Sequence, residues 1–336
     1  MKVLSLFDGM ACGMIAMQFA GMEVESYDAY EIDKYAIKTA QHNFPMIKEH
    51  GDVFSADFTQ YEGVDFLIGG SPCTYWSIAQ TKNRETVASG MGWELFSQYV
   101  RALHEAKPKY FIYENNKSMS KDIRASIDKT FGFEAVLINS ALVSAQNRQR
   151  LYWVGKRNDD GTYSKVMVDQ PEDRGILLRD ILESGIAWHE KSYCITATEY
   201  KGSNPQQTLT KHRRTMVAEP VEPRCVAQCG RYPENPKLRV AGLPTEQMFE
   251  AREDGKTHQV YEVRNGLITI KGKQYPIKLK DGYYIIRKLT VRECMRLQTV
   301  PEWYEFPVSN SQAYKMLGNG WTVDVIVHIL KGLKEA

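Results

Sequence analysis

The sequence predicts an α/β protein built on a doubly wound, parallel sheet. Through residue 157, short apolar runs alternate with amphipathic stretches at the spacing of strands and crossover helices. Glycine and polar residues directly follow several of these runs, as expected where the carboxyl ends of parallel strands form a binding edge. The 336 residues are enough for one large domain or two unequal ones.

The elements of this region can be assigned in order along the chain. We predict strands over residues 2–7, 23–31, 64–70, 109–114, 133–140 and 150–157. We predict helices over residues 10–20, 33–44 and 93–107, with Gly21 ending the first of them.

After Arg157 the chain becomes rich in turn residues, and its strands look short and irregular. Helical patterns return over residues 289–300 and 312–336. We therefore predict a discontinuous α/β domain of residues 1–157 and 285–336, with an insert of residues 158–284.

Composition excludes several classes of protein. The apolar runs are strand-sized and the N-terminus reads as a strand, so we expect neither a membrane span nor a signal peptide. Six scattered cysteines argue against a disulfide framework and favour the reducing cytoplasm. Cys225 and Cys229 are spaced C-x3-C, but no second Cys/His pair follows at finger-like spacing, so we predict no metal site. A net charge of +2 says little about a polyanionic partner.

Three predicted strand ends suggest a site for a nucleoside-containing cofactor. The loop FDGMACG (residues 7–13) has glycines that permit close approach of a ligand, although it is neither a dinucleotide fingerprint nor a P-loop. Glu31 stands where an acid commonly holds ribose hydroxyls, although an acid favoured by a helix N-terminus is the alternative. Asp52 stands at a third position of this kind.

Other strand ends carry groups suited to catalysis. In GGSPCTYWS, Cys73 follows a strand; taken alone, a buried packing cysteine is the commoner interpretation and a nucleophile the alternative. Glu114 ends an apolar run, and its carboxyl group could be either a catalytic acid or a structural acid bonded to backbone amides. Gln146, Arg148 and Arg150 alternate, so in an extended strand they share one face and could clamp a planar polar group. Snorkelling surface arginines are the alternative.

In their linear order, these motifs resemble the cytosine-C5 DNA methyltransferase family. The resemblance rests on FDGMACG, GGSPCTYWS, YENN, QNRQRLYWVG, RKLTVRECMRLQTVP and MLGNGWTVDVI. It covers residues 1–157 and 285–336, and is nearest the branch that includes the animal de novo methyltransferases and many bacterial and phage enzymes. It implies a Rossmann-like methyltransferase sheet, with residues 158–284 as a target-recognition region.

The resemblance also implies a reaction and its site. The cofactor would be S-adenosylmethionine. Cys73 would add to C6 of cytosine, Glu114 would act at N3, and Arg148 and Arg150 would contact the base and steady the site. The implied cofactor residues are Phe7, Gly9, Met10, Cys12, Glu31, Ile32, Asp52, Val53, Pro72, Leu95, Asn319 and Trp321.

The implied partner is double-stranded DNA, from which the cytosine must be flipped out. We expect a monomer in the cytoplasm of a prokaryotic or phage-infected cell, associated with the nucleoid. A partner restriction endonuclease is left open, and the target sequence cannot be derived.

The chain departs from the family pattern at three positions. Thr74 replaces a usual glutamine, Asn116 a usual apolar residue and Ala11 a usual glycine. The sequence disfavours two alternatives to DNA methylation. A catalytically silent regulator on the same fold would lack the cysteine or the glutamate, and both are present. An enzyme acting on tRNA would carry a Cys-Phe-Thr tripeptide in the insert, and none is found.

Overall fold

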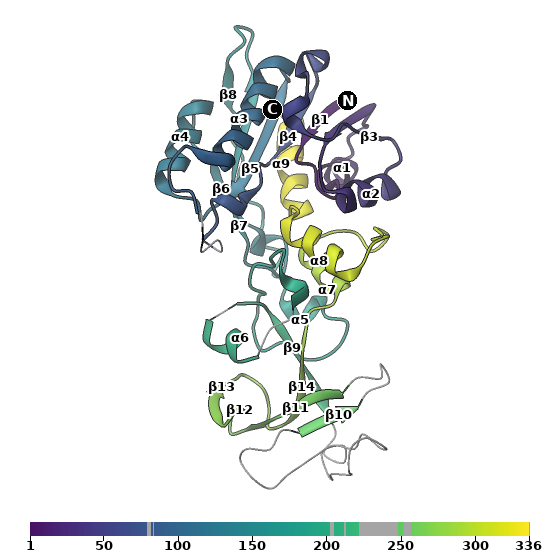
Figure 1. Cartoon of the computed structure of the whole chain (residues 1–336), viewed down its shortest axis with the longest axis vertical. Coiled ribbons are helices and arrows are strands. Elements are labelled where there is room, and N and C mark those ends of the chain that lie inside the picture. Colours follow the sequence, from purple (N-terminus) through teal and green to yellow (C-terminus); the bar gives the residue numbers. More distant parts are fainter. Residues whose placement is uncertain are drawn as a thin grey trace.

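The computed structural model describes residues 1–78, 82, 84–201, 205–211, 213–221, 248–251 and 257–335. The molecule is elongated (Figure 1), with a layered α/β part at one end and an antiparallel sheet at the other. Both termini lie in the α/β part. Because the C-terminal helices run back into it, this part is assembled from both ends of the sequence.

Within the described residues, the first sheet has eight strands in the order β3-β2-β1-β4-β5-β7-β6, with β8 paired to β7. The bounds are Lys2–Leu6 (β1), Ser26–Tyr30 (β2), Ile47–Glu49 (β3), Phe66–Gly69 (β4), Tyr110–Asn116 (β5), Val136–Asn139 (β6), Gln149–Arg157 (β7) and Tyr163–Lys165 (β8). Strands β1 to β5 run parallel, whereas β7 is antiparallel to β5 and β6. The predicted doubly wound α/β fold is confirmed, with β7 as its antiparallel member.

The order of the first sheet positions a binding site. From β1 the chain moves outward through β2 to β3, then returns to β4 on the other side of β1. Connections on opposite sides leave a crevice at the carboxyl ends of β1 and β4, where ligands bind in open α/β sheets.

Helices cover both faces of this sheet. One apolar core contains Val3 and residues of α1 (Cys12–Phe19), α2 (Lys34–Asn43) and α9 (Val323–Glu335). The other contains Leu4 and Leu6 with residues of α3 (Gly90–Ala106) and α4 (Lys121–Phe131). Val3 and Leu4 belong to different cores because successive side chains of a strand point to opposite faces.

Strand β3 and helix α4 are elements that the periodicity did not predict. The capping of α4 is clear: the Ser120 hydroxyl accepts from the Ile123 amide, and Gly132 ends the helix at φ 81°. A serine N-cap and a left-handed glycine are the usual boundaries of a helix. These two signals were present in the sequence.

The inserted region is more regular than predicted. Its described strands form a six-stranded antiparallel sheet in the order β13-β12-β11-β14-β9, with β10 paired to β11. The bounds are Met216–Val221 (β9), Met248–Ala251 (β10), Thr257–Arg264 (β11), Leu267–Ile270 (β12), Lys273–Pro276 (β13) and Gly282–Lys288 (β14). The turns Asn265–Gly266 and Lys271–Gly272 have positive φ at both residues. Such turns favour tight hairpins, which explains the regular sheet.

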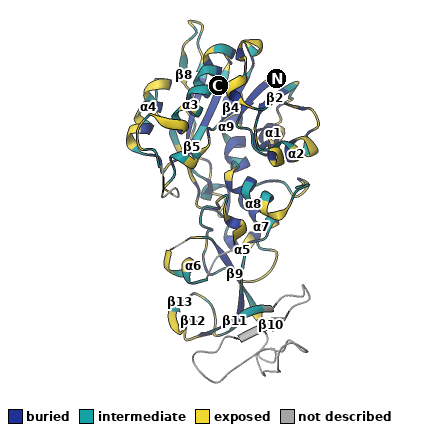
Figure 2. Ribbon diagram, viewed as in Figure 1, coloured by how far each residue is buried: buried dark blue, intermediate teal, exposed yellow. Residues whose placement is uncertain are grey.

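Short helices connect the two sheets. They are α5 (Leu178–Ile181), α6 (Pro205–Lys211), α7 (Val291–Leu297) and α8 (Asn310–Asn319), with the one-turn helix Glu199–Lys201 (η5). Four further one-turn helices lie in loops of the α/β part: Val53–Ser55 (η1), Phe58–Tyr61 (η2), Cys73–Tyr75 (η3) and Ser140–Leu142 (η4). The buried residues follow the first sheet and its inner helices (Figure 2). Among the described helices, none combines the length and apolar character needed to cross a membrane.

Candidate active site

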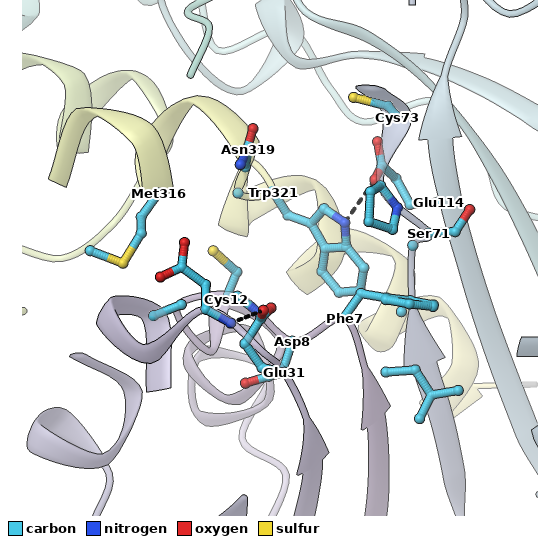
Figure 3. A pocket seen from close by; sticks show the side chains of 18 of the residues that line it. Phe7, Asp8, Cys12, Glu31, Ser71, Cys73, Glu114, Met316, Asn319 and Trp321 are labelled. Atoms are coloured by element: carbon cyan, nitrogen blue, oxygen red, sulfur yellow. Dashed lines mark hydrogen bonds between the residues drawn. The ribbon is translucent and has the colours of Figure 1, made fainter. Parts of the chain in front are cut away.

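A pocket lies at the carboxyl ends of β1, β2, β4 and β5, where the strand order reverses (Figure 3). The turn between α8 and α9 forms one of its walls. The predicted site residues that line it are Phe7, Gly9, Cys12, Glu31, Ile32, Pro72, Cys73, Glu114, Arg148, Arg150, Asn319 and Trp321. Stretches more than 300 residues apart in sequence, such as those of Phe7 and Trp321, therefore share one cavity.

The Glu31 carboxylate is held rigidly at one end of the pocket. Its Oε1 accepts from the amides of Ile32 and Asp33, both at 2.8 Å, and its Oε2 accepts from the Gly9 amide at 2.9 Å. Gly9 has φ 63°, a left-handed conformation that glycine adopts without strain. Because Oε2 accepts only this one hydrogen bond, it keeps a lone pair for a ligand hydroxyl.

Met10, Asp52, Val53 and Leu95 are predicted cofactor residues that do not line the pocket. The Asp52 side chain instead caps η1 by accepting from the Phe54 amide at 3.0 Å. Met10 and Val53 are buried in the two apolar cores, and Leu95 lies on α3. None of these four side chains forms part of the pocket surface.

The Glu114 carboxylate lies at the other end of the pocket and is clamped from two sides. The Arg150 Nε is 3.0 Å from Oε1, and the Trp321 indole Nε1 donates to Oε2 at 2.9 Å (Figure 3). The Glu114 and Arg150 side chains are 12% and 14% exposed, so solvent screens this pair only partly. The carboxylate is therefore fixed in position before any substrate arrives.

The loop before Cys73 is tied to β5. The Asn115 side-chain amide donates to the Ser71 carbonyl oxygen at 3.1 Å, and Ser71 Oγ lies 2.6 Å from Tyr113 Oη. A Cβ at Gly70 would approach the Glu114 carbonyl oxygen to 2.6 Å and its Oε2 to 3.0 Å. The second glycine of GGSPC is therefore needed because the Glu114 strand passes too close for a side chain.

Cys73 is the first residue of η3, and it lines the pocket. Burial raises its pKa, Arg150 and Arg148 act to lower it, and Glu114 and Cys194 act to raise it further; the net pKa is raised. A thiol of this kind is largely protonated in the free protein.

Comparison with known proteins identifies the family of the chain. Residues 1–335 match the family described as C-5 cytosine-specific DNA methylase. The chain belongs to this family. The type II methyltransferase M1.ScrFI of Lactococcus lactis subsp. cremoris is 30% identical over 361 residues, which cover 99% of this chain and 78% of that protein. The orphan methyltransferase M.SPRI of Bacillus phage SPR is 34% identical over 434 residues, which cover 99% of this chain and 97% of that protein.

A solved structure agrees at the level of the fold. The Schizosaccharomyces pombe Dnmt2 methyltransferase has a TM-score of 0.58 at 16% identity, covering 99% of this chain and 98% of that one. The predicted family, the α/β fold and the assignment as a DNA cytosine-C5 methyltransferase are confirmed.

In this methyltransferase, the two arginines have different surroundings. Arg150 pairs with Glu114, as described above. Arg148 Nη2 donates to the carbonyl oxygens of Gly318 and Gly320, at 3.1 and 2.8 Å, and Nη1 donates to that of Ile195 at 3.2 Å. Arg148 therefore ties the segment that directly precedes β7 to the C-terminal pocket wall and to the inserted region.

Of the departures from the family pattern, Asn116 has a local explanation. It is buried; its side-chain Nδ2 donates to Asn115 Oδ1 at 3.1 Å and its side-chain Oδ1 accepts from Ser118 Oγ at 2.6 Å, so it stabilises a turn. Ala11 adopts φ 60°, a left-handed backbone that is strained for a residue other than glycine. Thr74 lines the pocket, and no contact explains why threonine replaces the usual glutamine at this position.

The structure adds residues to the predicted site. Asp8 lines the pocket; its Oδ1 accepts from Ser5 and Tyr27, both at 2.6 Å, while its buried Oδ2 has no hydrogen-bond partner. Burial raises the pKa of Asp8 to about 6. Cys194 contacts both arginines. Asp8 could have been found in FDGMACG, but nothing in the sequence around Cys194 marks it.

The metal prediction is tested only in part. No cluster of His, Cys, Asp and Glu suited to a metal ion occurs among the residues that the structure describes. Cys225 and Cys229 lie outside them.

Proposed function

We propose that this methyltransferase uses S-adenosylmethionine, bound between Glu31 and Trp321. The pocket chemistry fits that molecule. Glu31 Oε2 has a free lone pair for a ribose hydroxyl, and the apolar surfaces of Phe7, Ile32 and Trp321 suit a purine and a thioether chain. The buried, unpartnered Oδ2 of Asp8 suits a cationic ligand, because an uncompensated carboxylate oxygen gains from a positive partner. When bound, the cofactor would supply a methyl group activated by its sulfonium charge.

We propose that Cys73 is the nucleophile and that Glu114 acts at N3 of the flipped cytosine. The observation that carries this proposal is the fixed Glu114 carboxylate, held by Arg150 and Trp321 in the same pocket as the Cys73 thiol. Cytosine C5 is a weak nucleophile. Addition of the Cys73 sulfur to C6 makes C5 enamine-like and places negative charge on the ring, which a hydrogen bond or proton at N3 relieves.

As the Cys73 sulfur forms its bond to C6, the thiol proton would pass to water and the C5–C6 π electrons would shift toward N3, where Glu114 supplies a hydrogen bond or a proton. C5 would then bond to the methyl carbon as the carbon–sulfur bond of the sulfonium breaks, leaving a neutral thioether. Once C5 carries the methyl group, its proton leaves to a base, the electrons of that C–H bond restore the C5–C6 double bond, and the C6–S bond breaks to release Cys73. We propose water or hydroxide as that base. We propose that Arg150 steadies Glu114 throughout and that Arg148 positions the surrounding backbone.

We propose residues 158–284 as the target-recognition region, with residues 1–157 and 285–336 as the catalytic domain. The separate antiparallel sheet supports this division, although β14 extends across its last boundary. A second lobe beyond the pocket would let duplex DNA contact both parts while one cytosine enters the site.

We further propose a monomer acting in the cytoplasm of a prokaryotic or phage-infected cell, at the nucleoid, because the relatives come from bacteria and a Bacillus phage. A partner restriction endonuclease fits the type II relatives, and solitary action fits the orphan relative.

The decisive experiment measures transfer of tritium from methyl-labelled S-adenosylmethionine to duplex DNA of diverse sequence. We expect label in cytosine C5 with the wild type and none with Cys73→Ala, while Cys73→Ala still binds the labelled cofactor and melts cooperatively. Glu114→Gln should be strongly impaired, whereas the matched change Glu134→Gln, on an exposed side chain, should not. No labelled DNA with the wild type would overturn the proposal. Transfer to tRNA instead of DNA would reassign the substrate.

Bisulfite sequencing of DNA from cells that express the chain would then identify the target site. Methylation at one short sequence motif is expected. Scattered cytosine methylation without a motif would contradict the proposed role of residues 158–284.

A further inference from the structure

Cys194 lies against Arg148, which directly precedes β7, and against Arg150 on β7. Its Sγ accepts from Arg148 Nη1 at 3.4 Å and from Arg150 Nη2 at 3.8 Å. The flanking backbone is anchored, because the Asn147 amide donates to the Ser192 carbonyl oxygen and the Ile195 amide donates to Gln146 Oε1, both at 2.9 Å. The sulfur therefore cannot easily move away from the guanidinium groups.

Two nearby cations change the chemistry of this thiol. Burial acts to raise the pKa of Cys194, but the charges and hydrogen bonds of Arg148 and Arg150 outweigh it, and the pKa is lowered. The other titratable groups that face these arginines are Glu114 on β5, which is paired with Arg150, Cys73 on η3, Tyr152 on β7 and Cys12 on α1.

The other described cysteines differ from Cys194. Cys12, Cys73, Cys194 and Cys294 are all free thiols. Burial is the main cause of a raised pKa at Cys12, Cys73 and Cys294. Cys12 and Cys294 are also buried, whereas Cys73 and Cys194 are both partly exposed. Cys194 differs from Cys73 in its direct contacts with both guanidinium groups, which favour the reactive thiolate.

We propose that Cys194 is a modification site at which peroxide oxidises this protein before it oxidises the nucleophile Cys73. The Cys194 sulfur attacks one oxygen of hydrogen peroxide, an S–O bond forms and the O–O bond breaks. The sulfur is oxidised by two electrons to a sulfenic acid, and the second oxygen leaves as hydroxide and takes a proton to become water.

The surroundings suit the oxidised product as well as the thiolate. Nη1 of Arg148 and Nη2 of Arg150 contact the sulfur directly, so an oxygen added to it stays beside two charged donors. A charged donor stabilises such an oxygen strongly.

Oxidation at Cys194 would also reach the catalytic pocket. Arg150 uses Nε for Glu114 and Nη2 for Cys194, so one rigid guanidinium joins the two acceptors. A new oxygen on Cys194 changes the position that Arg150 prefers, and Glu114 loses its alignment. This functional consequence rests on the proposed role of Glu114, whereas the site of oxidation does not.

The site of oxidation can be tested on the full chain without measuring activity. The wild type is treated with hydrogen peroxide in the presence of dimedone, which traps sulfenic acids, and its peptides are quantified by mass spectrometry. We expect at least tenfold more trapped product at Cys194 than at Cys73, and the same labelling of Cys194 in Cys73→Ser. Equal or greater trapping at Cys73, or none at Cys194, would overturn the proposal.

A second measurement tests the consequence for methyl transfer. The wild type should lose most of its activity after peroxide and regain it with dithiothreitol, because a sulfenic acid is reducible. Cys194→Ser, normalised to its own untreated activity, should resist the same treatment. If Cys194→Ser loses the same fraction as the wild type, the inactivation arises elsewhere and this part of the proposal is wrong.

Discussion

The indole Nε1 of Trp321 donates to Oε2 of Glu114 over 2.9 Å. This bond joins the turn between α8 and α9 to the end of β5, across 207 positions of sequence. Trp321 also lines the pocket proposed for the cofactor. One side chain therefore contacts both the Glu114 carboxylate and the pocket proposed for the cofactor.

Trp321→Phe should lower the rate of methyl transfer by roughly 10- to 100-fold. It removes the hydrogen-bond donor but keeps an aromatic ring, and a hydrogen bond to a charged group is worth about 1.5–3 kcal/mol. Single-turnover kinetics at saturating cofactor would measure the loss. The control is Trp303→Phe, since Trp303 is 49% exposed and contacts Phe44. An unchanged rate for Trp321→Phe would mean that its indole N–H is dispensable.

Arg150→Gln should make Cys73 less reactive near neutral pH. Arg150 is the largest influence that lowers the pKa of Cys73, so removing it raises that pKa further. The rate of Cys73 alkylation by iodoacetamide, followed against pH by mass spectrometry, should therefore shift to higher pH. Arg264→Gln, on an exposed arginine of β11, should give the wild-type profile. A profile that does not move would show that Arg150 does not influence the thiol.

Glu31→Gln should weaken S-adenosylmethionine binding by about tenfold or more, the equivalent of one lost hydrogen bond to a charged group. The substitution removes the charge and brings an amide N–H₂ toward backbone N–H donors. Calorimetric titration measures the dissociation constant. Glu25→Gln, an exposed change just before β2, is the matched control. Equal affinity in both variants would place the ribose contact elsewhere.

Glu49→Gln should flatten the loss of stability at alkaline pH. Burial, with Asp8 and Glu31 nearby, raises the pKa of Glu49 from 4.5 to about 8, and both carboxylate oxygens are buried without partners. The folded protein thus holds a proton that the unfolded chain releases, so stability falls as pH rises from about 4.5 through 8. Melting temperatures at pH 6 and pH 9 measure this fall.

The melting temperature of the wild type should drop more between these two pH values than that of Glu49→Gln. Glu25→Gln should follow the wild type. Parallel pH dependence in Glu49→Gln and wild type would show that Glu49 is ionised in the folded protein.

Much of the first sheet could be predicted because its signals are local. The strand at β1 and the helices α1, α2 and α3 follow from apolar periodicity and from residues such as Gly21. The inserted sheet was underestimated because its pairing depends on turns. Asn265–Gly266 carries the hairpin signal, yet the surrounding polar residues obscure the strands that it joins.

The candidate site was predictable to the extent that its residues stand at strand ends. Cys73, Glu114 and Glu31 follow apolar runs, so the topology brings them to one edge of the sheet. Asp52 also follows this rule but caps η1 instead, because a short acidic side chain also satisfies a helix N-terminus.

By itself, the sequence determined the fold class, the family and the order of the catalytic motifs, because these depend on residue types and spacing. Only the tertiary structure decided which groups touch. It showed that Trp321 contacts Glu114, that Arg148 and Arg150 have different partners, and that Cys194 lies against both. These contacts join residues far apart in sequence. Burial and charge at such contacts set the reactivity of a thiol, and neither can be read from its neighbours along the chain.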